Sequence, residues 1–214
     1  MIEEKFVSLI SGGIDSPVAA WMIFSKGYTP IFVFFDNYPF TGETTKQRVV
    51  NSVEKLKECM PSAQAKLYII PHGEDLADIL RNCPRNLTCI LCRRMMYRLA
   101  REIAEMENAD VLVTGEIIGE HASQTLRNLC VAGTAVEDVG ILRPLLCFDK
   151  YEVENLGRKI GTFSTSTSSA LCCSAPPKEP RTQARMDEVI KAEQRLDLAY
   201  MVQRNLAKTE SISI

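Results

Sequence analysis

A serine- and glycine-rich turn near the N-terminus holds the first residues that could do chemistry. Residues 11–16 read Ser-Gly-Gly-Ile-Asp-Ser and lie between a short apolar run, residues 5–10, and an apolar stretch that starts at Pro17. Such a strand-turn-helix junction offers backbone N–H groups and a helix dipole to an anion, and two glycines let the backbone approach closely. The turn lacks the lysine of a Walker loop and the third glycine of a dinucleotide fingerprint, so neither a kinase-like site nor an NAD site is favoured. The candidate phosphate-binding residues are Ser11, Gly12, Gly13, Asp15 and Ser16.

Cysteine spacing is the second signal. Among the eight cysteines, Cys89 and Cys92 form a CxxC pair at the start of a predicted helix, and Cys172 and Cys173 are adjacent in a later loop. A CxxC pair at a helix N-terminus is expected to have lowered thiol pKa values and can ligate a metal or an iron–sulfur cluster, or cycle as a redox pair. A zinc site would need a second CxxC or a spaced histidine pair, which the two histidines do not provide. If the later loop folds over the carboxyl edge of the sheet, it adds a third ligand and leaves one coordination position open.

The other four cysteines are interpreted differently. Free cysteine is among the most buried residue types, so Cys59, Cys130 and Cys147 are predicted to pack in the core. Cys83 precedes a proline in an irregular stretch, where it could serve as a fourth ligand.

A run of arginines surrounds the CxxC pair. Between residues 79 and 101 the chain has six arginines and no acidic residue, although the whole chain is net acidic. Such a patch suits a polyanion such as RNA or the phosphates of ATP. Arg93, next to Cys92, is predicted to lie inside the site, whereas a solvated helix face explains Arg98 and Arg101 equally well.

Two further residues could contact a nucleotide. Gly115 closes a predicted strand at Thr114-Gly115-Glu116, and Gln124 follows on the next predicted helix. Gly115 would allow close approach of a nucleotide, and Gln124 could hydrogen-bond it. A plain strand end and helix surface explain both residues about as well.

The hydrophobic pattern predicts the elements that must position these residues. Strands are expected at residues 5–10, 30–35, 66–70, 110–114 and 139–142. Helices are expected at 17–24, 44–60, 74–80, 92–106, 120–129, 149–160 and 181–208, with a Ser/Thr-, Cys- and Pro-rich loop at 162–180 and a frayed end after 210. Strands that alternate with helices at this pitch predict an α/β fold with a parallel twisted sheet, helices on both faces, and a site beyond the carboxyl ends of the strands.

Composition excludes several classes of protein. The chain has 214 residues, a formal net charge of -2, 46% hydrophobic and 24% charged residues. Its length argues against a disulfide-stapled mini-protein, and no apolar run approaches the roughly 20 residues that span a bilayer. The charged start does not resemble a signal peptide, so we expect a cytoplasmic protein with reduced thiols and no membrane partner. A charge near zero argues against attraction of nucleic acid over the whole surface.

Taken together, the motifs closely resemble the catalytic domain of the ThiI family, which makes 4-thiouridine in tRNA. The matching segments begin at residues 11 (Ser-Gly-Gly-Ile-Asp-Ser-Pro-Val-Ala-Ala), 92 (Cys-Arg-Arg-Met-Met-Tyr-Arg-Leu-Ala) and 112 (Leu-Val-Thr-Gly-Glu). Others begin at residues 122 (Ala-Ser-Gln-Thr-Leu), 142 (Leu-Arg-Pro-Leu), 149 (Asp-Lys-Tyr-Glu-Val) and 160 (Ile-Gly-Thr). The resemblance covers residues 6 to about 198 and implies a Rossmann-like adenine nucleotide α hydrolase fold with a pyrophosphate (PP) loop.

The resemblance also implies a reaction and its site. ATP, with Mg²⁺, would adenylate the uridine carbonyl with release of pyrophosphate, and a sulfur nucleophile would then displace AMP. Asp15 matches the acidic residue needed for adenylation, and Arg93, Gly115 and Gln124 match nucleotide-contacting positions. Cys173 matches the family cysteine of persulfide chemistry, with Cys172 beside it.

Some archaeal relatives use a CxxC with that later cysteine to bind an iron–sulfur cluster. The residues that match this arrangement are Cys89, Cys92 and Cys173, which would hold a [4Fe-4S] or [3Fe-4S] cluster, with zinc or a redox pair as the remaining options.

The resemblance further suggests the domain layout and the partners. Residues 1–180 are expected to form the PP-loop domain, including the Cys-rich loop 162–180, and residues 181–214 a helical extension packed on it. We expect this chain to lack the RNA-binding THUMP domain that family members usually carry and the sulfur-delivering rhodanese domain that some carry. We therefore expect tRNA to be presented by a separate THUMP-type protein or a second subunit, a sulfide or persulfide carrier as sulfur donor, and a homodimer as one option.

Two other functions remain open at this stage. One is an amidotransferase-type or other adenylating ligase that acts on a small molecule, for which the cysteine triad would be unnecessary. The other is a nucleotide-binding or sulfur-carrying subunit of a larger complex.

Overall fold

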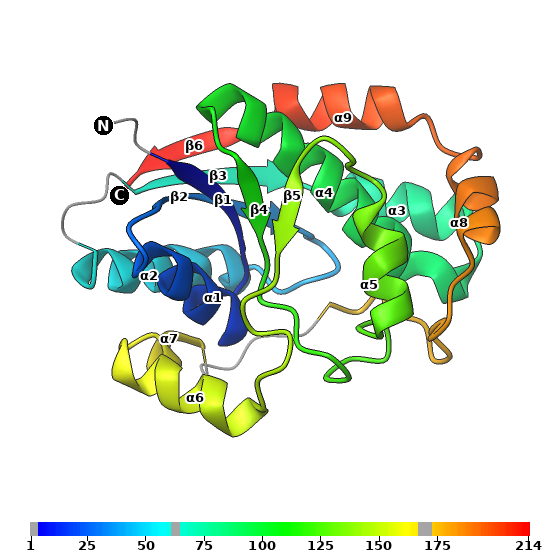
Figure 1. The fold of residues 1–214 in the computed structure, drawn as a ribbon. Coiled ribbons are helices and arrows are strands. Elements are labelled where there is room, and N and C mark those ends of the chain that lie inside the picture. The colour runs from blue at the N-terminus through cyan, green and yellow to red at the C-terminus, as the bar shows by residue number, and fades with distance from the viewer. Residues whose placement is uncertain (1–3, 61–64, 167–172) are drawn as a thin grey trace.

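A six-stranded sheet forms the centre of the molecule (Figure 1). The computed structural model describes residues 4–60, 65–166 and 173–214. Within these ranges the strand order is β5-β4-β1-β2-β3-β6; the first five strands in this order are parallel and β6 runs antiparallel to β3. The strands are β1 (Lys5–Ile10), β2 (Thr29–Asp36), β3 (Lys66–Pro71), β4 (Val111–Val113), β5 (Gly140–Leu142) and β6 (Glu210–Ser213).

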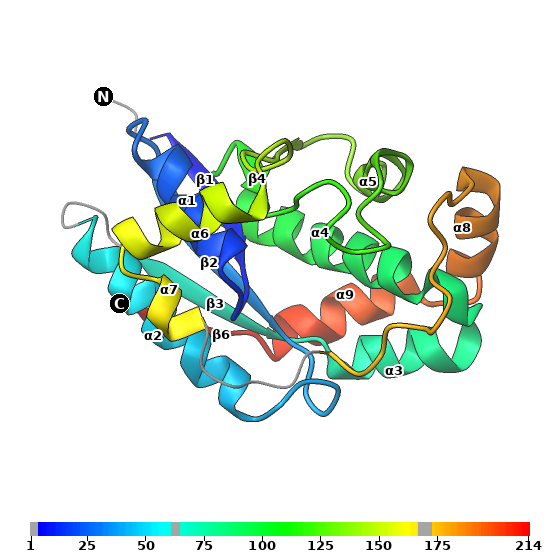
Figure 2. The ribbon, with the colours of Figure 1, turned by 90° about the horizontal axis from the view of Figure 1, so that it is seen from below.

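Helices cover both faces of the sheet, as predicted (Figure 2). One face carries α1 (Asp15–Phe24), α2 (Thr44–Glu58), α6 (Lys150–Lys159) and the short α7 (Phe163–Ser166). On the other face lie α4 (Thr88–Glu107), α5 (Leu126–Gly133) and α9 (Leu198–Ala207), with α3 (Gly73–Asn82), the 3₁₀ turn η1 (Arg85–Leu87) and α8 (Met186–Glu193) packed at the outer end of α4. No helix in the described ranges is long and apolar enough to cross a bilayer.

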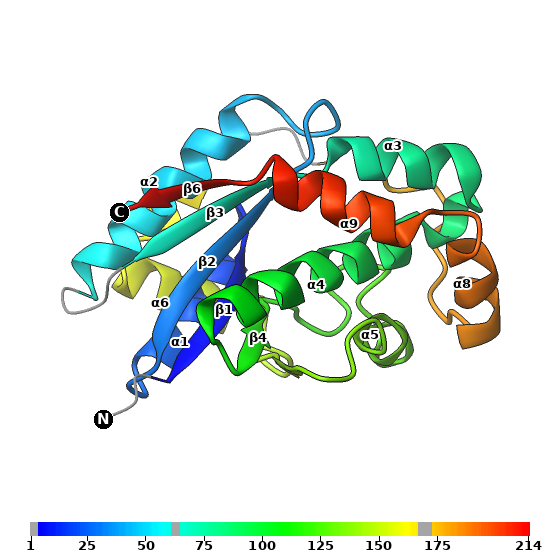
Figure 3. The ribbon, with the colours of Figure 1, turned by 90° about the horizontal axis from the view of Figure 1, so that it is seen from above.

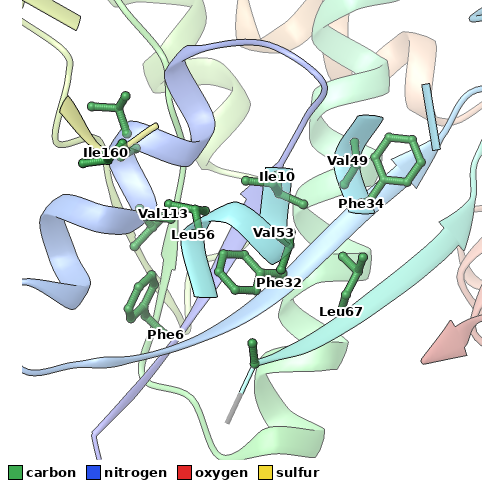
Figure 4. Close-up of a cluster of buried hydrophobic side chains, with 14 of the residues drawn as sticks. Phe6, Ile10, Phe32, Phe34, Val49, Val53, Leu56, Leu67, Val113 and Ile160 are labelled. Carbon is green, nitrogen blue, oxygen red and sulfur yellow. The ribbon is translucent and has the colours of Figure 1, made fainter. Parts of the chain in front are cut away.

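Alternation along the strands produces two hydrophobic layers. In β2, Phe32 and Phe34 point toward α1 and α2, whereas Ile31, Val33 and Phe35 join the layer under α4 and α9. Figure 4 shows the first of these layers, where side chains from the sheet meet those of α2. Because successive strand residues face opposite sides, a strand that is apolar at every position must be covered on both faces.

The chain reverses its direction of sheet growth next to β1. From β1 it proceeds to β2 and β3 on one side, and then returns to place β4 on the other side of β1. In open parallel sheets, ligands bind beyond the carboxyl ends of the strands at such a switch point. The Ser-Gly-Gly turn follows β1 and Gly115 follows β4, so the fold brings both predicted motifs to this place.

Three predicted helix boundaries were wrong. The helix α4 begins at Thr88, so the CxxC pair lies inside its first turns rather than at its start. The helix α5 begins at Leu126, because the Thr125 side chain caps it by accepting a bond from the backbone N–H of Asn128 at 3.2 Å. The predicted helix 181–208 consists of two helices, α8 and α9, and a short helix, α7, occupies part of the predicted Ser/Thr loop.

The prediction of a frayed C-terminus was also wrong. Residues of β6 pair with β3, so the segment 181–214 contributes an edge strand as well as helices (Figure 3). An unpaired edge would leave the N–H and C=O groups of β3 open, and β6 satisfies them. Its sequence, Glu-Ser-Ile-Ser, has little strand character of its own.

Candidate active site

Serine hydroxyls hold the turn after β1 in a closed shape. The Ser11 backbone N–H donates to Ser16 Oγ at 2.8 Å, and the two hydroxyl oxygens lie 3.0 Å apart. The Gly13 N–H donates to Ser11 Oγ at 3.3 Å. Ile14, the N-cap of α1, provides no capping side chain, so the helix start suits an anion from outside the protein. The turn is therefore shaped for phosphate before any ligand arrives.

A cavity of about 310 Å³ opens beside this turn. Its walls come from the turn, the ends of β2 and β4, the first half of α4 and the segment before α5. The structure thus brings together seven of the eight residues predicted to bind a nucleotide, and only Gly13 does not line the cavity. The seven are Ser11, Gly12, Asp15, Ser16, Arg93, Gly115 and Gln124.

Four buried side-chain oxygens in the cavity wall have no hydrogen-bond partner among the described residues. They are Asn37 Oδ1, Thr41 Oγ1, Thr45 Oγ1 and Gln124 Oε1. Leaving a buried acceptor unpaired costs about 1 to 3 kcal/mol, so such groups are normally satisfied by a ligand or water. This wall is suited to a ligand rich in N–H and O–H groups. Sequence reasoning missed Asn37 and Thr41 of the β2–α2 segment and Thr45 in the first turn of α2, which carry no recognisable motif.

The structure explains the glycine at position 115 by a backbone contact, not by the predicted close approach of a nucleotide. A Cβ at this position would lie 2.6 Å from the Ser16 backbone nitrogen and 2.7 Å from the Asp15 carbonyl carbon. The glycine therefore allows the end of β4 to pack against the start of α1, backbone against backbone. Its effect on a bound nucleotide acts through the shape of the turn.

A buried carboxylate fixes Arg93. Glu116 Oε1 lies 2.8 Å from Arg93 Nε, and its Oε2 accepts bonds from Arg143 Nε at 2.7 Å and the Thr114 hydroxyl at 2.9 Å. Tyr97 also donates to Glu116, at 3.0 Å; burial and the nearby carboxylate raise the pKa of Tyr97, so it remains a donor. Two guanidinium groups on one carboxylate leave net positive charge at the cavity floor, as anion binding requires.

Lys150 binds Asp15, one of the residues that line the cavity. Its Nζ lies 2.8 Å from Asp15 Oδ1 and 2.5 Å from Glu120 Oε1, at the first turn of α6. Burial raises the pKa of Asp15, although the bond to Lys150 opposes this shift. Sequence reasoning missed Lys150 as a site residue, although the Asp-Lys pair at a predicted helix start was visible.

The cysteines of the CxxC pair approach Cys173. Burial, followed by the proximity of Cys173, raises the pKa of the Cys92 thiol; burial is also the main reason for the raised pKa of Cys89, and Cys173 adds to it. The predicted lowering of these pKa values was therefore wrong, because burial outweighs the helix N-terminus. Mutual effects on pKa place the three sulfurs within electrostatic range of one another. Cys172 lies outside the described residues.

The segment that carries Cys173 is tied to the cavity wall. The Ser174 backbone N–H donates to the Phe40 carbonyl at 2.8 Å, and its hydroxyl donates to the same oxygen at 3.3 Å. Phe40 is next to Thr41, which lines the cavity. Arg93 follows Cys92 on α4 and also lines the cavity, so Cys92 and the segment of Cys173 each adjoin a wall of the cavity.

The chemistry of this donor set fits an iron–sulfur cluster. No three His, Cys, Asp or Glu side chains in the described ranges are arranged around a single metal ion. The thiols of Cys89 and Cys92, whose pKa values are raised, remain neutral until a cation compensates their charge, and iron–sulfur clusters are held by cysteine thiolates. Three ligands would leave one iron of a [4Fe-4S] cluster without a protein ligand.

The remaining cysteines do not behave as predicted. Cys59, Cys130 and Cys147 are exposed, not buried. Cys83 is buried in a separate cluster, where its thiol donates to the Ala192 carbonyl at 3.4 Å. This placement favours a packing role for Cys83 over that of a fourth ligand.

Most of the arginine run is neutralised by acidic residues that are distant in sequence. Arg94 and Arg98 both bind Glu193 of α8, and Arg101 binds Asp138. These pairs weaken the prediction of a basic patch for RNA. Of the arginines in the run, Arg93 alone lines the cavity.

The parallel sheet, the phosphate-shaped turn at its switch point and the adjoining cavity define an adenine nucleotide α hydrolase-like protein of the PP-loop class. Within that class, a family model described as Thiamine biosynthesis protein (ThiI) matches residues 1–198, and the chain belongs to this family. The fold also matches that of the NMN synthetase from Francisella tularensis, with a TM-score of 0.54 and 14% identity over 96% of this chain and 86% of that chain.

Curated relatives agree with the family. The chain is 38% identical over 212 residues to a probable tRNA sulfurtransferase of Methanosarcina mazei, covering 99% of this chain and 52% of that protein. It is 39% identical over 196 residues to a probable tRNA sulfurtransferase of Methanothermobacter thermautotrophicus, covering 92% of this chain and 50% of that protein. The chain thus spans about half the length of the curated relatives that it matches.

Two solved structures of RNA-modifying enzymes are also similar to this chain. A 4-thiouridine synthetase in complex with RNA and ATP superposes with a TM-score of 0.94 at 33% identity, covering 99% of this chain and 55% of that chain. The U34-tRNA thiolase NcsA of Methanococcus maripaludis, solved with its [4Fe-4S] cluster, shares the fold, with a TM-score of 0.54 at 15% identity over 97% of this chain and 73% of that chain.

Proposed function

We propose that this chain is the catalytic part of an ATP-dependent tRNA sulfurtransferase that converts a uridine to 4-thiouridine. The main support is the close superposition on a 4-thiouridine synthetase that binds ATP and RNA, together with a phosphate-shaped turn and cavity at the expected edge of the sheet. In the first step, uridine O4 attacks the α-phosphorus of ATP and pyrophosphate leaves. In the second, hydrosulfide adds to C4 and AMP leaves, taking the former O4 with it.

The residues of the cavity divide the first step between them. The turn from Ser11 to Ser16 binds the leaving pyrophosphate through its N–H groups, and Arg93 adds positive charge. Lys150, held by Asp15 and Glu120, neutralises charge that develops at the α-phosphate. Asp15 is the cavity carboxylate that would hold Mg²⁺, which supplies further charge neutralisation on the phosphates when bound.

The cysteines serve the second step. Cys89, Cys92 and Cys173 would hold a [4Fe-4S] or [3Fe-4S] cluster, which would supply a sulfur-binding position next to the adenylated base. The raised thiol pKa values and the shared wall with the cavity support this placement. The protein's own contribution is to hold the sulfur site a fixed distance from the nucleotide and to shield the adenylated base from water.

A direct assay tests this proposal. The reconstituted chain receives ATP, magnesium, sulfide and transcript tRNA, with and without a THUMP-type RNA-binding protein as the proposed partner, and pyrophosphate and thionucleosides are measured. We expect tRNA-dependent pyrophosphate release in at least one arm. Its absence in both would contradict the catalytic assignment. The sulfur donor, either sulfide or a persulfide carrier, is a separate part of the proposal and is tested by replacing the donor. The homodimer is another separate part and is tested by measuring the mass in solution.

The substitution Lys150→Met tests the proposed charge neutralisation. Loss of a charged hydrogen-bond partner is worth about 1.5 to 3 kcal/mol, so pyrophosphate release should slow about 10- to 100-fold. Steady-state kinetics would show the effect mainly in kcat, because the turn still binds ATP. Lys159→Met, at the exposed end of the same helix, is the matched control and should retain full activity.

Gly115→Ala tests the backbone contact behind the turn. The added Cβ would overlap the start of α1, and a strain of about 1 to 3 kcal/mol should weaken ATP binding roughly 10- to 100-fold. Gly140→Ala in the neighbouring strand is the control, since its Cβ would meet only Val111 Cγ1 at 3.5 Å. Calorimetric titration with ATP separates the two, and equal affinities would contradict the role of the contact.

A further inference from the structure

A fully buried histidine lies behind the cysteine site. His72 follows β3 directly and has no exposed surface. Its Nε2 lies 3.3 Å from Cys92 Sγ, and its Nδ1 lies 2.9 Å from Asp75 Oδ2. Asp75 is likewise fully buried. The three side chains form a continuous line from the sulfur to the first turn of α3.

Two residues of α9 hold the far end of this line. Arg204 donates to Asp75 Oδ1 at 2.5 Å, and the Asn205 side-chain amide donates to Asp75 Oδ2. A carboxylate that only accepts hydrogen bonds requires a hydrogen on His72 Nδ1, so the ring must present Nε2 to the sulfur. Both α9 residues lie beyond residues 1–198, the part that the family model matches.

The His72 ring also packs against a residue that lines the nucleotide cavity. The rings of Phe35 and His72 meet edge to face, with centroids 5.7 Å apart and planes at 68°. Phe35 also lines the cavity. The His72 backbone N–H donates to the Asp36 carbonyl at 2.8 Å, which fixes the residue against β2. His72 therefore has one orientation, set by contacts from several elements.

We propose that His72, oriented by Asp75, is a positioning residue that fixes the sulfur of Cys92 toward Cys89 and Cys173. An unrestrained cysteine side chain samples several staggered rotamers, and a hydrogen bond to a fixed ring selects one. Burial of a polar pair costs free energy that an apolar pair would avoid, so packing alone gives no reason for His72 and Asp75 here. The part of this inference that concerns a bound cluster rests on the proposed function.

Nuclear magnetic resonance of the full chain, reduced and without iron, tests the contact itself. The sequence has only two histidines, so the ring ¹⁵N signals are few and can be assigned with His121→Gln. We expect one ring with hydrogen on Nδ1, whose Nε2 signal shifts in Cys92→Ala while the His121 signals do not move. Cys59→Ala, at an exposed cysteine, is the control and should change neither ring. An unchanged His72 signal in Cys92→Ala would overturn the proposal.

Retention of iron tests the consequence. A Cys92 side chain that His72 already fixes before iron binds loses less rotamer freedom on binding, so His72→Ala should lose iron to a chelator about 2- to 10-fold more readily, and His72→Gln should lose less. Asn128→Ala removes a different fully buried polar group, one that bonds Ala184 N and the Arg181 carbonyl, and should retain iron like the wild type.

Two outcomes of the iron experiment would contradict a proposal: one the role of His72, the other the bound cluster. Equal losses in His72→Ala and Asn128→Ala would reduce His72 to a general stabilising role and overturn the proposal. If the wild type itself takes up no iron, the cluster in the proposed function fails, and the ring spectrum alone decides whether His72 positions Cys92.

Discussion

Cys173→Ser is expected to abolish transfer of sulfur to tRNA while leaving pyrophosphate release largely intact. Cys173 is absent from the cavity lining, so its loss should not disturb the nucleotide. Its sulfur is within electrostatic range of Cys89 and Cys92, and serine cannot replace it as a soft ligand or sulfur carrier. Removal of a group that acts directly in a reaction step reduces the rate severely, here by about 10³-fold or more.

The measurement compares two products in one reaction. Thionucleoside is quantified by mass spectrometry and pyrophosphate by a coupled assay, so the ratio reports uncoupling of the two steps. Cys147→Ser, at an exposed cysteine, is the matched control and should retain both products. If Cys173→Ser retained thionucleoside formation, the sulfur site would have to lie elsewhere.

Asp15→Asn is expected to reduce pyrophosphate release about 10²- to 10³-fold, the usual effect of losing one preorganised electrostatic group. Asparagine keeps the shape of the side chain but loses the charge that holds Lys150 at the cavity. The thiolation rate should fall in parallel, because adenylation precedes sulfur transfer. ATP affinity should change little, since the bonds between Ser11 and Ser16 that shape the turn remain.

The raised pKa of Asp15 predicts how Asp15→Asn changes the stability of the folded protein. When the folded-state pKa of a carboxyl lies above its unfolded value, the folded state binds the proton more tightly, and stability decreases as pH rises through that range. Asn cannot ionise, so the melting temperature of Asp15→Asn near pH 7 should equal or exceed that of the wild type. A lower melting temperature would mean that lost activity reflects damage to the fold.

Local patterns in the sequence predicted the sheet and most residues of the cavity lining that were expected to bind a nucleotide, because each depends on neighbouring residues. The strand, turn and helix around Gly12 and Gly13 are contiguous, and short continuous apolar runs indicate strands that are buried on both faces. The switch point then follows from the order of the elements, which places the turns after β1 and β4 at one edge.

The features that sequence reasoning missed depend on contacts between distant residues. Lys150 meets Asp15 across 135 positions, and Glu193 neutralises Arg94 and Arg98 across nearly 100. A single sequence does not show which acid a given arginine will meet. The strand β6 was missed for the same reason, since its polar residues become a strand only beside β3.

The predictions for the cysteines had different outcomes. That Cys89, Cys92 and Cys173 together form a site stays a prediction from their spacing, supported by the contribution of Cys173 to the raised pKa values of the other two thiols. Burial statistics misplaced Cys59, Cys130 and Cys147, since a preference of a residue type says nothing about the face on which one residue lies. The buried His72 gave no signal in sequence.

The most direct test of the central claim is mass spectrometry of tRNA nucleosides from cells that lack the gene. The proposed function predicts that 4-thiouridine disappears from their tRNA, returns when the wild-type gene is supplied, and does not return with the Asp15→Asn gene. Unchanged 4-thiouridine in the deletion strain would contradict it.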